Sequence, residues 1–225
     1  MSLVIKKIGF APDYVDYQEA LQLQKKLHAE VAAQTRQNTV LLLEHRAVIT
    51  AGKRTEKHEY PTDQTVPVIA IDRGGKLTWH GPGQLVGYPI LKLPEPLDVV
   101  RYVRLCEELI LAVLARLGIK AEQIEGRSGV WIPAHGQLAA QKIAAIGIRV
   151  AQNTTMHGFS INCNNDLAPF SSFIPCGIQD AGVTSISQQL GRNFEPSQLV
   201  PYLEQELQTY AHQLGKDFTP TETVN

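Results

Sequence analysis

A cysteine set between a proline and a glycine is the residue of this sequence best suited to nucleophilic chemistry. Cys176 lies in the stretch FIPCG at residues 173–177. The proline restricts the approaching backbone, and the glycine leaves one side of the thiol open. A free thiol has a pKa near ~8.5, so it needs a positive neighbour to be largely thiolate at neutral pH. A lone cysteine is more often a small buried hydrophobe, and the catalytic interpretation therefore depends on that neighbour.

Three polar side chains, each within an otherwise apolar segment, are candidates for the neighbour of Cys176: Lys142, His80 and His157. Spacing along the chain does not choose among them. Lys142 begins the strand-like segment 142–147, whose small residues suggest a backbone closely approached by a ligand or by a neighbouring segment. The alternative interpretation is an exposed lysine at the start of a strand.

The remaining cysteines and the histidines do not predict a metal site. Cys106 and Cys163 lie far from each other and form no C-x-x-C pair, so neither a disulfide framework nor a zinc knuckle is expected. The histidines form no H-x-x-x-H pair and are not accompanied by a carboxylate or thiol cluster. Cys106 falls on the apolar stripe of a predicted helix, which favours a place in the core.

The densest feature of the sequence is the glycine-rich segment RGGKLTWHGPGQ at residues 73–84. Glycine permits positive φ angles and lets a ligand approach the backbone closely, so we interpret this segment as a loop wrapped against something bound. The alternative is an elaborate turn. The spacing of its glycines is neither G-x-G-x-x-G nor that of a Walker phosphate loop, so it does not name a nucleotide.

These residues need a scaffold, and the apolar pattern predicts one of mixed type. Apolar residues at spacings of three and four predict helices at 17–33, at 98–117 and at 196–214, with Asp98 as an N-cap and Gly118 as a stop. β-Branched or aliphatic runs predict buried strands at residues 39–44 and 66–71, and further strands are expected at residues 3–8, 129–132, 142–150 and 156–162. The order is too irregular for a doubly wound sheet. The expected fold class is α/β in the broad sense, an α+β mixed β-sheet flanked by helices.

Composition predicts a single domain with no global charge bias. The chain has 225 residues, of which 44% are hydrophobic, enough for one core. We expect one domain over residues 1–215 and a polar C-terminal tail over 216–225. With 21 basic and 22 acidic residues, there is no electrostatic case for nucleic acid or an anionic membrane. No apolar stretch approaches the ~20 residues of a membrane span, and a cytoplasmic location is expected.

Four motifs in order carry a resemblance to a known family: RGGKLTWHGPGQLVGYP, KIAAIG, HGFSIN and FIPCG. Together they resemble the lipoyl(octanoyl) transferase family, also called lipoate-protein ligase B. The resemblance implies an α/β fold similar to the biotin/lipoate protein ligase catalytic domain, with no metal, nucleotide or other cofactor. It also implies transfer of octanoyl from acyl carrier protein to lipoyl domains, the first step of endogenous lipoate synthesis. The implied acceptors are the lipoyl domains of 2-oxoacid dehydrogenase complexes and the glycine cleavage H protein.

The same resemblance assigns residues to roles. It matches Cys176 to the family's acyl-thioester nucleophile and Lys142 to the lysine that lowers its pKa. Three stretches match those that line the family's acyl site: Arg73, Gly74, Gly75, Lys76, Leu77, Thr78, Trp79 and His80; Ala145, Ile146 and Gly147; and Gly158, Phe159 and Ser160. Ser160 replaces the alanine more usual there, so the acyl-chain preference is less firmly implied than the reaction.

Two rival functions remain open at this stage. An ATP-dependent lipoate or biotin-type ligase would make an acyl-adenylate from a free acid and would tolerate Cys176→Ser. A non-catalytic module that binds an acyl carrier would never acquire a covalent acyl group. For the transferase, the basic residues Lys53, Arg54 and Lys57 are candidates for docking the acidic carrier protein. The alternative for these residues is an ordinary solvated loop.

Overall fold

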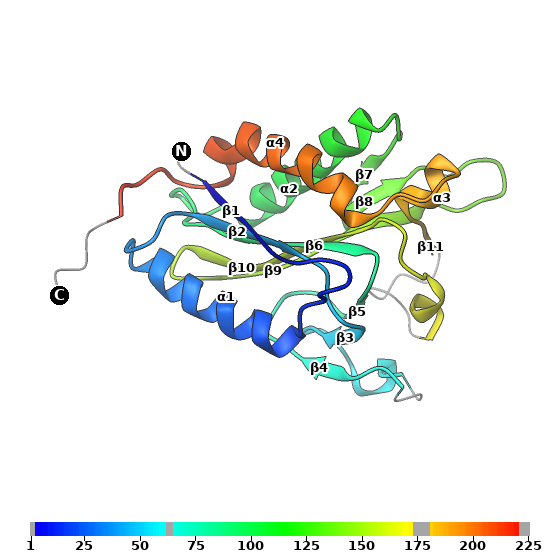
Figure 1. Cartoon of the computed structure of the whole chain (residues 1–225), viewed down its shortest axis with the longest axis horizontal. Helices are drawn as coiled ribbons and strands as arrows, with labels where there is room; N and C mark the ends of the chain where they lie inside the picture. The colour runs from blue at the N-terminus through cyan, green and yellow to red at the C-terminus, as the bar shows by residue number, and fades with distance from the viewer. Residues whose placement is uncertain (1–2, 62–64, 173–180, 221–225) are drawn as a thin grey trace.

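A mixed β-sheet with helices on both faces organises the chain (Figure 1). The computed structural model describes residues 3–61, 65–172 and 181–220. Its helices are α1 (Tyr17–Ala32), α2 (Val99–Arg116), α3 (Ile186–Leu190) and α4 (Pro196–Leu214), with short 3-10 turns η1 (Lys57–Glu59) and η2 (Ala168–Ser172). Its strands are β1 (Val4–Gly9), β2 (Thr39–Leu43), β3 (Val48–Ala51), β4 (Val68–Ala70), β5 (Leu77–His80), β6 (Gln84–Ile90), β7 (Glu122–Ile124), β8 (Arg127–Ile132), β9 (Gln141–Ala151), β10 (Thr154–Asn162) and β11 (Gly182–Val183).

The larger sheet runs in the order β1-β2-β6-β10-β9-β8-β7, with β11 paired to β9. The β1–β2 and β9–β11 pairs are parallel, and the other neighbours in this sheet are antiparallel. A smaller sheet, β4-β3-β5, lies beside it on the α1 side. The predicted fold class, a mixed sheet flanked by helices, is confirmed.

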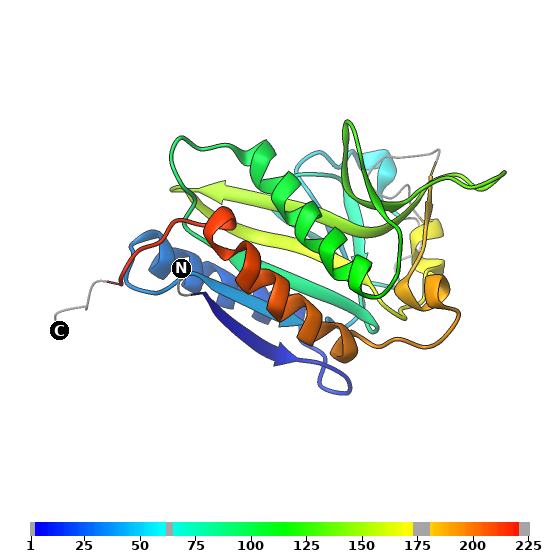
Figure 2. The same cartoon turned by 90° about the horizontal axis from the view of Figure 1, so that it is seen from above.

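Period-two alternation along the strands explains why both faces of the sheet are covered. In β2, Leu41 and Leu43 pack with α1, whereas Val40 and Leu42 belong to the larger core under α2 and α4. All four side chains are fully buried. Figure 2 shows α2 and α4 lying side by side across that second face. A strand apolar at every position therefore fits a sheet that is buried on both sides.

An aspartate caps the N-terminus of each of two helices, and one of them, Asp98, was predicted from the sequence. Asp16 accepts hydrogen bonds from the backbone N–H groups of Gln18 and Glu19, and Asp98 accepts one from Arg101 at 2.8 Å. These bonds satisfy N–H groups that have no partner inside the helix. After α2, Gly118 takes a φ of +76°, the left-handed conformation that ends many helices. The three predicted helices are confirmed, and Cys106 lies in the core at 3% exposure.

The strand predictions were less complete. The strand expected at 66–71 is shorter, Val68–Ala70, and the segment 73–84 expected to be a loop contains β5 and the first residue of β6. β3, β6, β7 and β11 were not predicted. In β6, Gly87 and Pro89 weaken the usual strand signal, yet both pair with β2 residues in the centre of the sheet.

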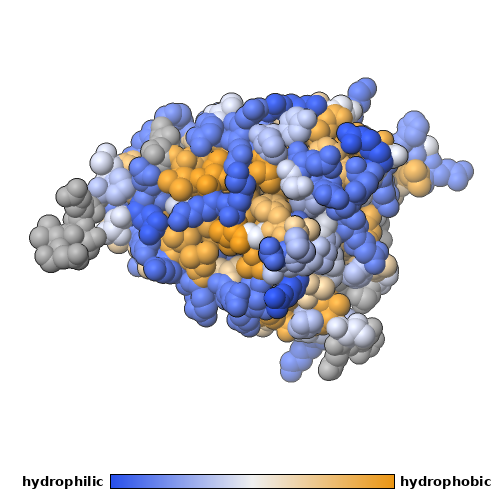
Figure 3. Space-filling view, in the orientation of Figure 1, coloured by the Kyte–Doolittle hydropathy of each residue, from blue (hydrophilic) through white to orange (hydrophobic). Residues whose placement is uncertain are grey.

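The polar end of the chain is attached to the fold at least in part. The backbone N–H of Lys216 donates to the carbonyl of Lys92 at 2.7 Å, and Phe218 packs against the core on the α1 side. The domain boundary at residue 215 stays a prediction. None of the helices in the described ranges is long and apolar enough to cross a membrane. On the face in Figure 3, apolar surface shows as patches among hydrophilic residues.

Truncating the core beneath α2 and α4 should destabilise the protein strongly. Leu42→Ala removes a side chain with 0% exposure, so we expect the free energy of unfolding to fall by about 2–5 kcal/mol. Urea denaturation measures this value. Leu138→Ala is the matched control, because Leu138 is 66% exposed and should change stability by no more than about 0.5 kcal/mol. Equal effects of the two substitutions would contradict the assigned core.

Candidate functional site

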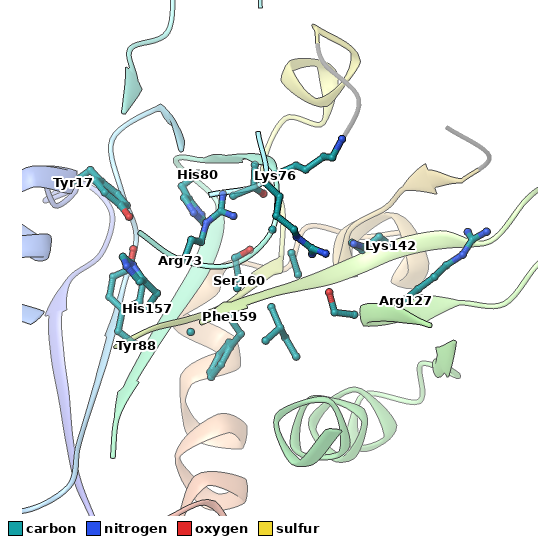
Figure 4. Close-up of a pocket in the computed structure, with 18 of the residues that line it drawn as sticks. Tyr17, Arg73, Lys76, His80, Tyr88, Arg127, Lys142, His157, Phe159 and Ser160 are labelled. Carbon is teal, nitrogen blue, oxygen red and sulfur yellow. The ribbon is translucent and has the colours of Figure 1, made fainter. Parts of the chain in front are cut away.

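A cavity of about 230 Å³ lies where β9 and β10 meet the glycine-rich segment and the first residue of α1 (Figure 4). Its wall collects residues that are far apart in sequence. Those predicted from the sequence to bind substrate and found on the wall are Arg73, Gly75, Lys76, Thr78, His80, Ala145, Ile146, Gly147, Gly158, Phe159 and Ser160. Lys142 and His157, both considered as activators of Cys176, are on the same wall.

Lys142 is the second residue of β9 and only 7% exposed. Its Nζ lies over the ring of Trp131, 4.6 Å from the ring centroid. The two residues are paired across β8 and β9. On another side, Lys142 lines a small second cavity with Thr78, Gln84 and Ser160. The alternative of an exposed lysine at a strand start is therefore wrong.

Arg73 is a buried residue beside β9. Its Nη2 donates to both the carbonyl and the hydroxyl of Thr50 at 2.9 Å, and its Nη1 donates to Gly74 O at 2.8 Å. Gly147 makes room for this side chain, because a Cβ there would come within 2.8 Å of Arg73 Cδ. The run of small residues in β9 thus accommodates a neighbouring segment of the protein, one of the two possibilities predicted from sequence.

The basic segment at residues 52–54 is joined by backbone hydrogen bonds to the glycine-rich segment. The N–H groups of Gly52, Lys53 and Arg54 donate to the carbonyls of residues 76, 73 and 75 at 3.3, 3.0 and 3.1 Å. Arg54 is exposed and lines the cavity. The most basic stretch of the chain therefore forms part of the cavity's rim.

A chain of hydrogen bonds fixes the tautomer of His80. Asn162 Nδ2 donates to Thr184 O at 2.9 Å, so Asn162 Oδ1 accepts from Gln84 Nε2 at 2.9 Å. Gln84 Oε1 is then the acceptor for His80 Nδ1 at 2.7 Å. Because Nδ1 carries the proton, His80 Nε2 holds a lone pair. It has no hydrogen-bond partner within the described ranges.

Burial keeps His80, on the cavity wall, and its neighbour His45 neutral. Burial and then the charge of His45 lower the pKa of His80 to about 3. Burial likewise lowers the pKa of His45 to about 4, against the opposing effect of its hydrogen bond to Val15 O. His45 Nδ1 donates to that carbonyl at 3.0 Å, so its Nε2 accepts from the Tyr88 hydroxyl at 2.7 Å. A neutral imidazole of fixed tautomer, that of His80, therefore lines this end of the cavity, and the neutral ring of His45 packs beside it.

His157 forms a separate pair with Asp72. Its Nε2 donates to Asp72 Oδ1 at 2.8 Å, and Arg149 lies 3.0 Å from the other carboxylate oxygen. Burial raises the pKa of Asp72, but the hydrogen bond to His157 and the nearby charges outweigh burial, so the pKa is below its usual value. The pKa of His157 is lowered by burial in spite of this partner. Its φ of +61° is a strained conformation for a non-glycine residue.

Sheet register places His157 and Lys142 at opposite ends of the cavity. His157 pairs with Ile148, which is six residues beyond Lys142 on β9. At about 3.3 Å per residue, the two backbones are about 20 Å apart. In Figure 4, His157 lies beside Tyr17 and Tyr88, whereas Lys142 lies away from them beside Arg127.

Three of the predicted binding residues do not line this cavity. β5 alternates, so Thr78 and His80 face the cavity whereas Leu77 and Trp79 pack into the core of the smaller sheet. Gly74 instead donates its N–H to Ile148 O at 2.9 Å. Cys176 and its motif at residues 173–177 lie outside the described residues, so the role predicted for Cys176 stays a prediction. Burial raises the pKa of Cys106 to about 12, and it also raises the pKa of Cys163.

Sequence reasoning missed several residues of the wall. Tyr17 comes from the first position of α1 and Tyr88 from β6. Gly126 comes from the β7–β8 turn, and Arg127 and Ser128 are the first two residues of β8. The run EGRSG at residues 125–129 offered a weak signal, since glycines flank a charged residue. Nothing in the local pattern of Tyr17 or Tyr88 separates them from ordinary core aromatics. No group of three or more metal-ligating side chains occurs within residues 3–61, 65–172 and 181–220.

Comparisons with known proteins agree on one family. The model of the lipoyl protein ligase A/B catalytic domain matches residues 16–208. An octanoyltransferase of Renibacterium salmoninarum is 54% identical over 206 residues, covering 92% of this chain and 88% of that protein. One from Leifsonia xyli subsp. xyli is 55% identical, covering 92% and 90%. A solved bi-partite lipoate protein ligase of Thermoplasma acidophilum, at 14% identity, covers 99% of this chain and 87% of that one with a TM-score of 0.68, which shows a shared fold.

Acidification should destabilise the protein through its buried histidines. Between the ordinary histidine pKa of 6.5 and about 4, unfolded His45 and His80 bind protons that the folded state does not bind. Because the unfolded state holds more protons, stability rises with pH and falls on acidification, by up to about 1.4 kcal/mol per pH unit for each histidine. Urea denaturation across this pH range measures the slope.

Two variants test the assignment of that slope. His80→Gln should reduce the dependence of stability on pH by up to the contribution of one histidine, about 1.4 kcal/mol per pH unit. His58→Gln should leave it unchanged, because the side chain of His58 is 75% exposed. A slope that is the same in His80→Gln as in the parent protein would contradict the effect of burial on His80.

Proposed function

The chain belongs to the lipoyl protein ligase A/B catalytic domain family and is an acyltransferase of the lipoyl(octanoyl) transferase group, and from this premise we propose its donor, acceptor and chemical route. The donor is octanoyl carried as a thioester on acyl carrier protein. The acceptor is the lysine of a lipoyl domain, and the acyl group passes through a thioester on Cys176. The observation that carries this proposal is a buried lysine, Lys142, on the wall of a cavity in a chain 54–55% identical to octanoyltransferases.

In the first half-reaction, the ammonium of Lys142 stabilises the thiolate of Cys176. The sulfur attacks the carbonyl carbon of the donor thioester, and the bond from that carbon to the carrier's sulfur breaks. The carrier leaves as a thiol once it takes up a proton, which Lys142 can supply. The product is an octanoyl thioester on Cys176. Because the donor is already a thioester, this route requires no ATP.

In the second half-reaction, the neutral amine of the acceptor lysine attacks the same carbonyl carbon. A C–N bond forms, the bond to Cys176 sulfur breaks, and the amine loses a proton. Acylation has removed the negative charge of Cys176, and Lys142 has given up its proton in the first half-reaction, so its neutral amine can accept the proton that the acceptor lysine loses. This step does not suit His157, because its backbone lies about 20 Å along the sheet from that of Lys142.

His80 contributes to this chemistry as a hydrogen-bond acceptor. A neutral imidazole with a pKa of about 3 binds protons too weakly to act as an efficient base near neutral pH. Its Nε2 lone pair can still accept a hydrogen bond from an amine or a thiol. We therefore assign the proton transfers to Lys142 and a positioning role to His80.

The acyl chain would lie over the small residues of β9 and β10. Ala145 pairs with Ser160, and Gly147 pairs with Gly158, on the strip between Lys142 and Arg73. Burying about six methylenes at ~0.8 kcal/mol each favours a medium-length chain over a very short one by about 5 kcal/mol. The hydroxyl of Ser160 adds a polar group beside that strip. Ser160 is therefore the residue to examine for the enzyme's acyl-chain preference.

The covalent intermediate is the first test of this route. After incubation with octanoyl-acyl carrier protein, intact-mass analysis should show one added octanoyl group that hydroxylamine removes. Cys176→Ser should show none, whereas Cys106→Ala and Cys163→Ala should retain the adduct, because both thiols are buried. An adduct absent from the parent protein under turnover conditions would falsify the thioester route. Octanoyl-adenylate formed from free acid and ATP would instead indicate the ligase reaction.

Docking of the acidic carrier is the second test. Lys53, Arg54 and Lys57 are exposed, and none forms an ion pair with the described part of the chain. Reversing all three to Glu should slow the first half-reaction about tenfold or more at low salt and weaken its salt dependence. The matched control reverses the exposed residues Lys6, Lys25 and Lys120 on other elements. Rates equal to those of this control would refute the docking patch.

A further inference from the structure

A buried ammonium needs a group that stabilises its charge. Lys142 is 7% exposed, and within residues 3–61, 65–172 and 181–220 no carboxylate forms an ion pair with it. Other cations line the same cavity and oppose its charge: Arg54, Arg73, Lys76 and Arg127. The residues that share the smaller cavity with Lys142 are neutral: Thr78, Gln84, Ala144, Ala145, Ser160, Asn162, Phe170 and Val183.

The indole of Trp131 supplies what these neighbours lack. Its ring centroid is 4.6 Å from Lys142 Nζ, within the ~6 Å over which an aromatic face attracts a cation. Trp131 is 1% exposed, and burial strengthens this attraction because water does not compete. The guanidinium carbon of Arg127 lies over the same ring at 5.9 Å. Trp131 therefore contacts two cations of the cavity wall.

The backbone of β8 is shaped to make this contact. The register with β9 shifts between Val130 and Trp131, which is an irregularity that redirects a side chain. Gly129 has a φ of +109°, and a Cβ there would come within 2.5 Å of Ala144 O and 3.3 Å of Lys142 Cε. Only glycine leaves the aliphatic part of the lysine this space. The strand thus provides both the room for Lys142 and the ring beneath its charge.

A buried carboxylate on α2 holds this part of β8 in place. Glu107 is fully buried, and its Oε1 accepts the backbone N–H of Gly129 at 2.8 Å. Its other oxygen pairs with Arg104 at 2.6 Å. The carboxylate is therefore committed to the backbone of β8 and to Arg104, and it does not serve as the counter-ion of Lys142.

We infer that Trp131 is a positioning residue for acyl transfer, whose indole face holds the ammonium of Lys142 at the cavity wall and so supports the thiolate of Cys176. This inference rests on the proposed roles of Cys176 and Lys142. It also gives the two half-reactions opposite requirements. The first uses the charged lysine, which the indole favours, and the second uses the neutral amine, which the indole disfavours.

The test measures thiolate formation without any acyl donor. Iodoacetamide alkylation of Cys176, followed by mass spectrometry across a pH series, gives the midpoint at which the thiolate forms. Trp131→Leu removes the ring, so we expect this midpoint to rise by roughly 0.4–1.5 pH units. Trp131→Phe should give a smaller rise, because a phenyl face attracts a cation less than an indole face does. If Trp131→Leu does not fold, the Phe variant carries the test.

Two controls separate positioning from a general loss of stability. Val130→Ala removes a buried neighbour in the core and should leave the midpoint unchanged. In a Lys142→Ala background, Trp131→Leu should cause no further shift, since the two residues then have nothing to couple. Midpoints of folded Trp131 variants equal to that of the parent protein would overturn the inference, and so would an undiminished shift in the Lys142→Ala background.

The two half-reactions provide an independent readout. Trp131→Leu should slow formation of the octanoyl adduct more than it slows transfer from the adduct to the acceptor lysine. Equal slowing of both steps would point to a merely structural role and reject the positioning role. The alkylation assay needs no adduct, so a failure of the proposed thioester route and a failure of this inference are read in different experiments.

Discussion

The charge of one buried lysine sets the conditions for the rest of the site. Lys142 lies at the start of the longest strand, with small residues along one side and an aromatic ring beneath its Nζ. Gly129 on β8 leaves space for the aliphatic part of this lysine, and Glu107 on α2 accepts a hydrogen bond from the backbone N–H of Gly129. A side chain that requires this much preparation is costly to bury. Buried ionisable side chains with prepared surroundings cluster at functional sites, where their charge takes part in the reaction.

The two ends of the cavity differ in their electrostatics. Around Tyr88, the histidines are neutral and their protons are fixed by carbonyl or amide acceptors. At the other end, Lys142 and Arg127 place two cations over the ring of Trp131, whereas Arg73 lies toward the histidines, against Gly147. A negative charge that develops beside Lys142 during acyl transfer is therefore stabilised by two neighbouring cations. The cavity has a direction, and that direction follows the β9–β10 pair.

The sequence predicted the helices and the fold class well because these depend on local chemistry. Asp98 and Gly118 flank α2 as expected, and the run of β2 is apolar enough to be recognised alone. The site was harder to predict. Its four motifs identify the segments that line the cavity, but not the alternation that turns Leu77 and Trp79 away from it. Trp131 carries no local signal, since its role arises from a register shift between strands.

The basic segment at residues 52–54 and the glycine-rich segment that lines the cavity are joined into one backbone unit. Three consecutive N–H groups of residues 52–54 hold the carbonyls of the segment that carries Arg73. A carrier protein that docks on Lys53 and Arg54, as proposed, would therefore contact the same backbone unit that holds Arg73 beside the cavity. Docking of the donor and the geometry of the cavity wall would then be coupled through three backbone hydrogen bonds.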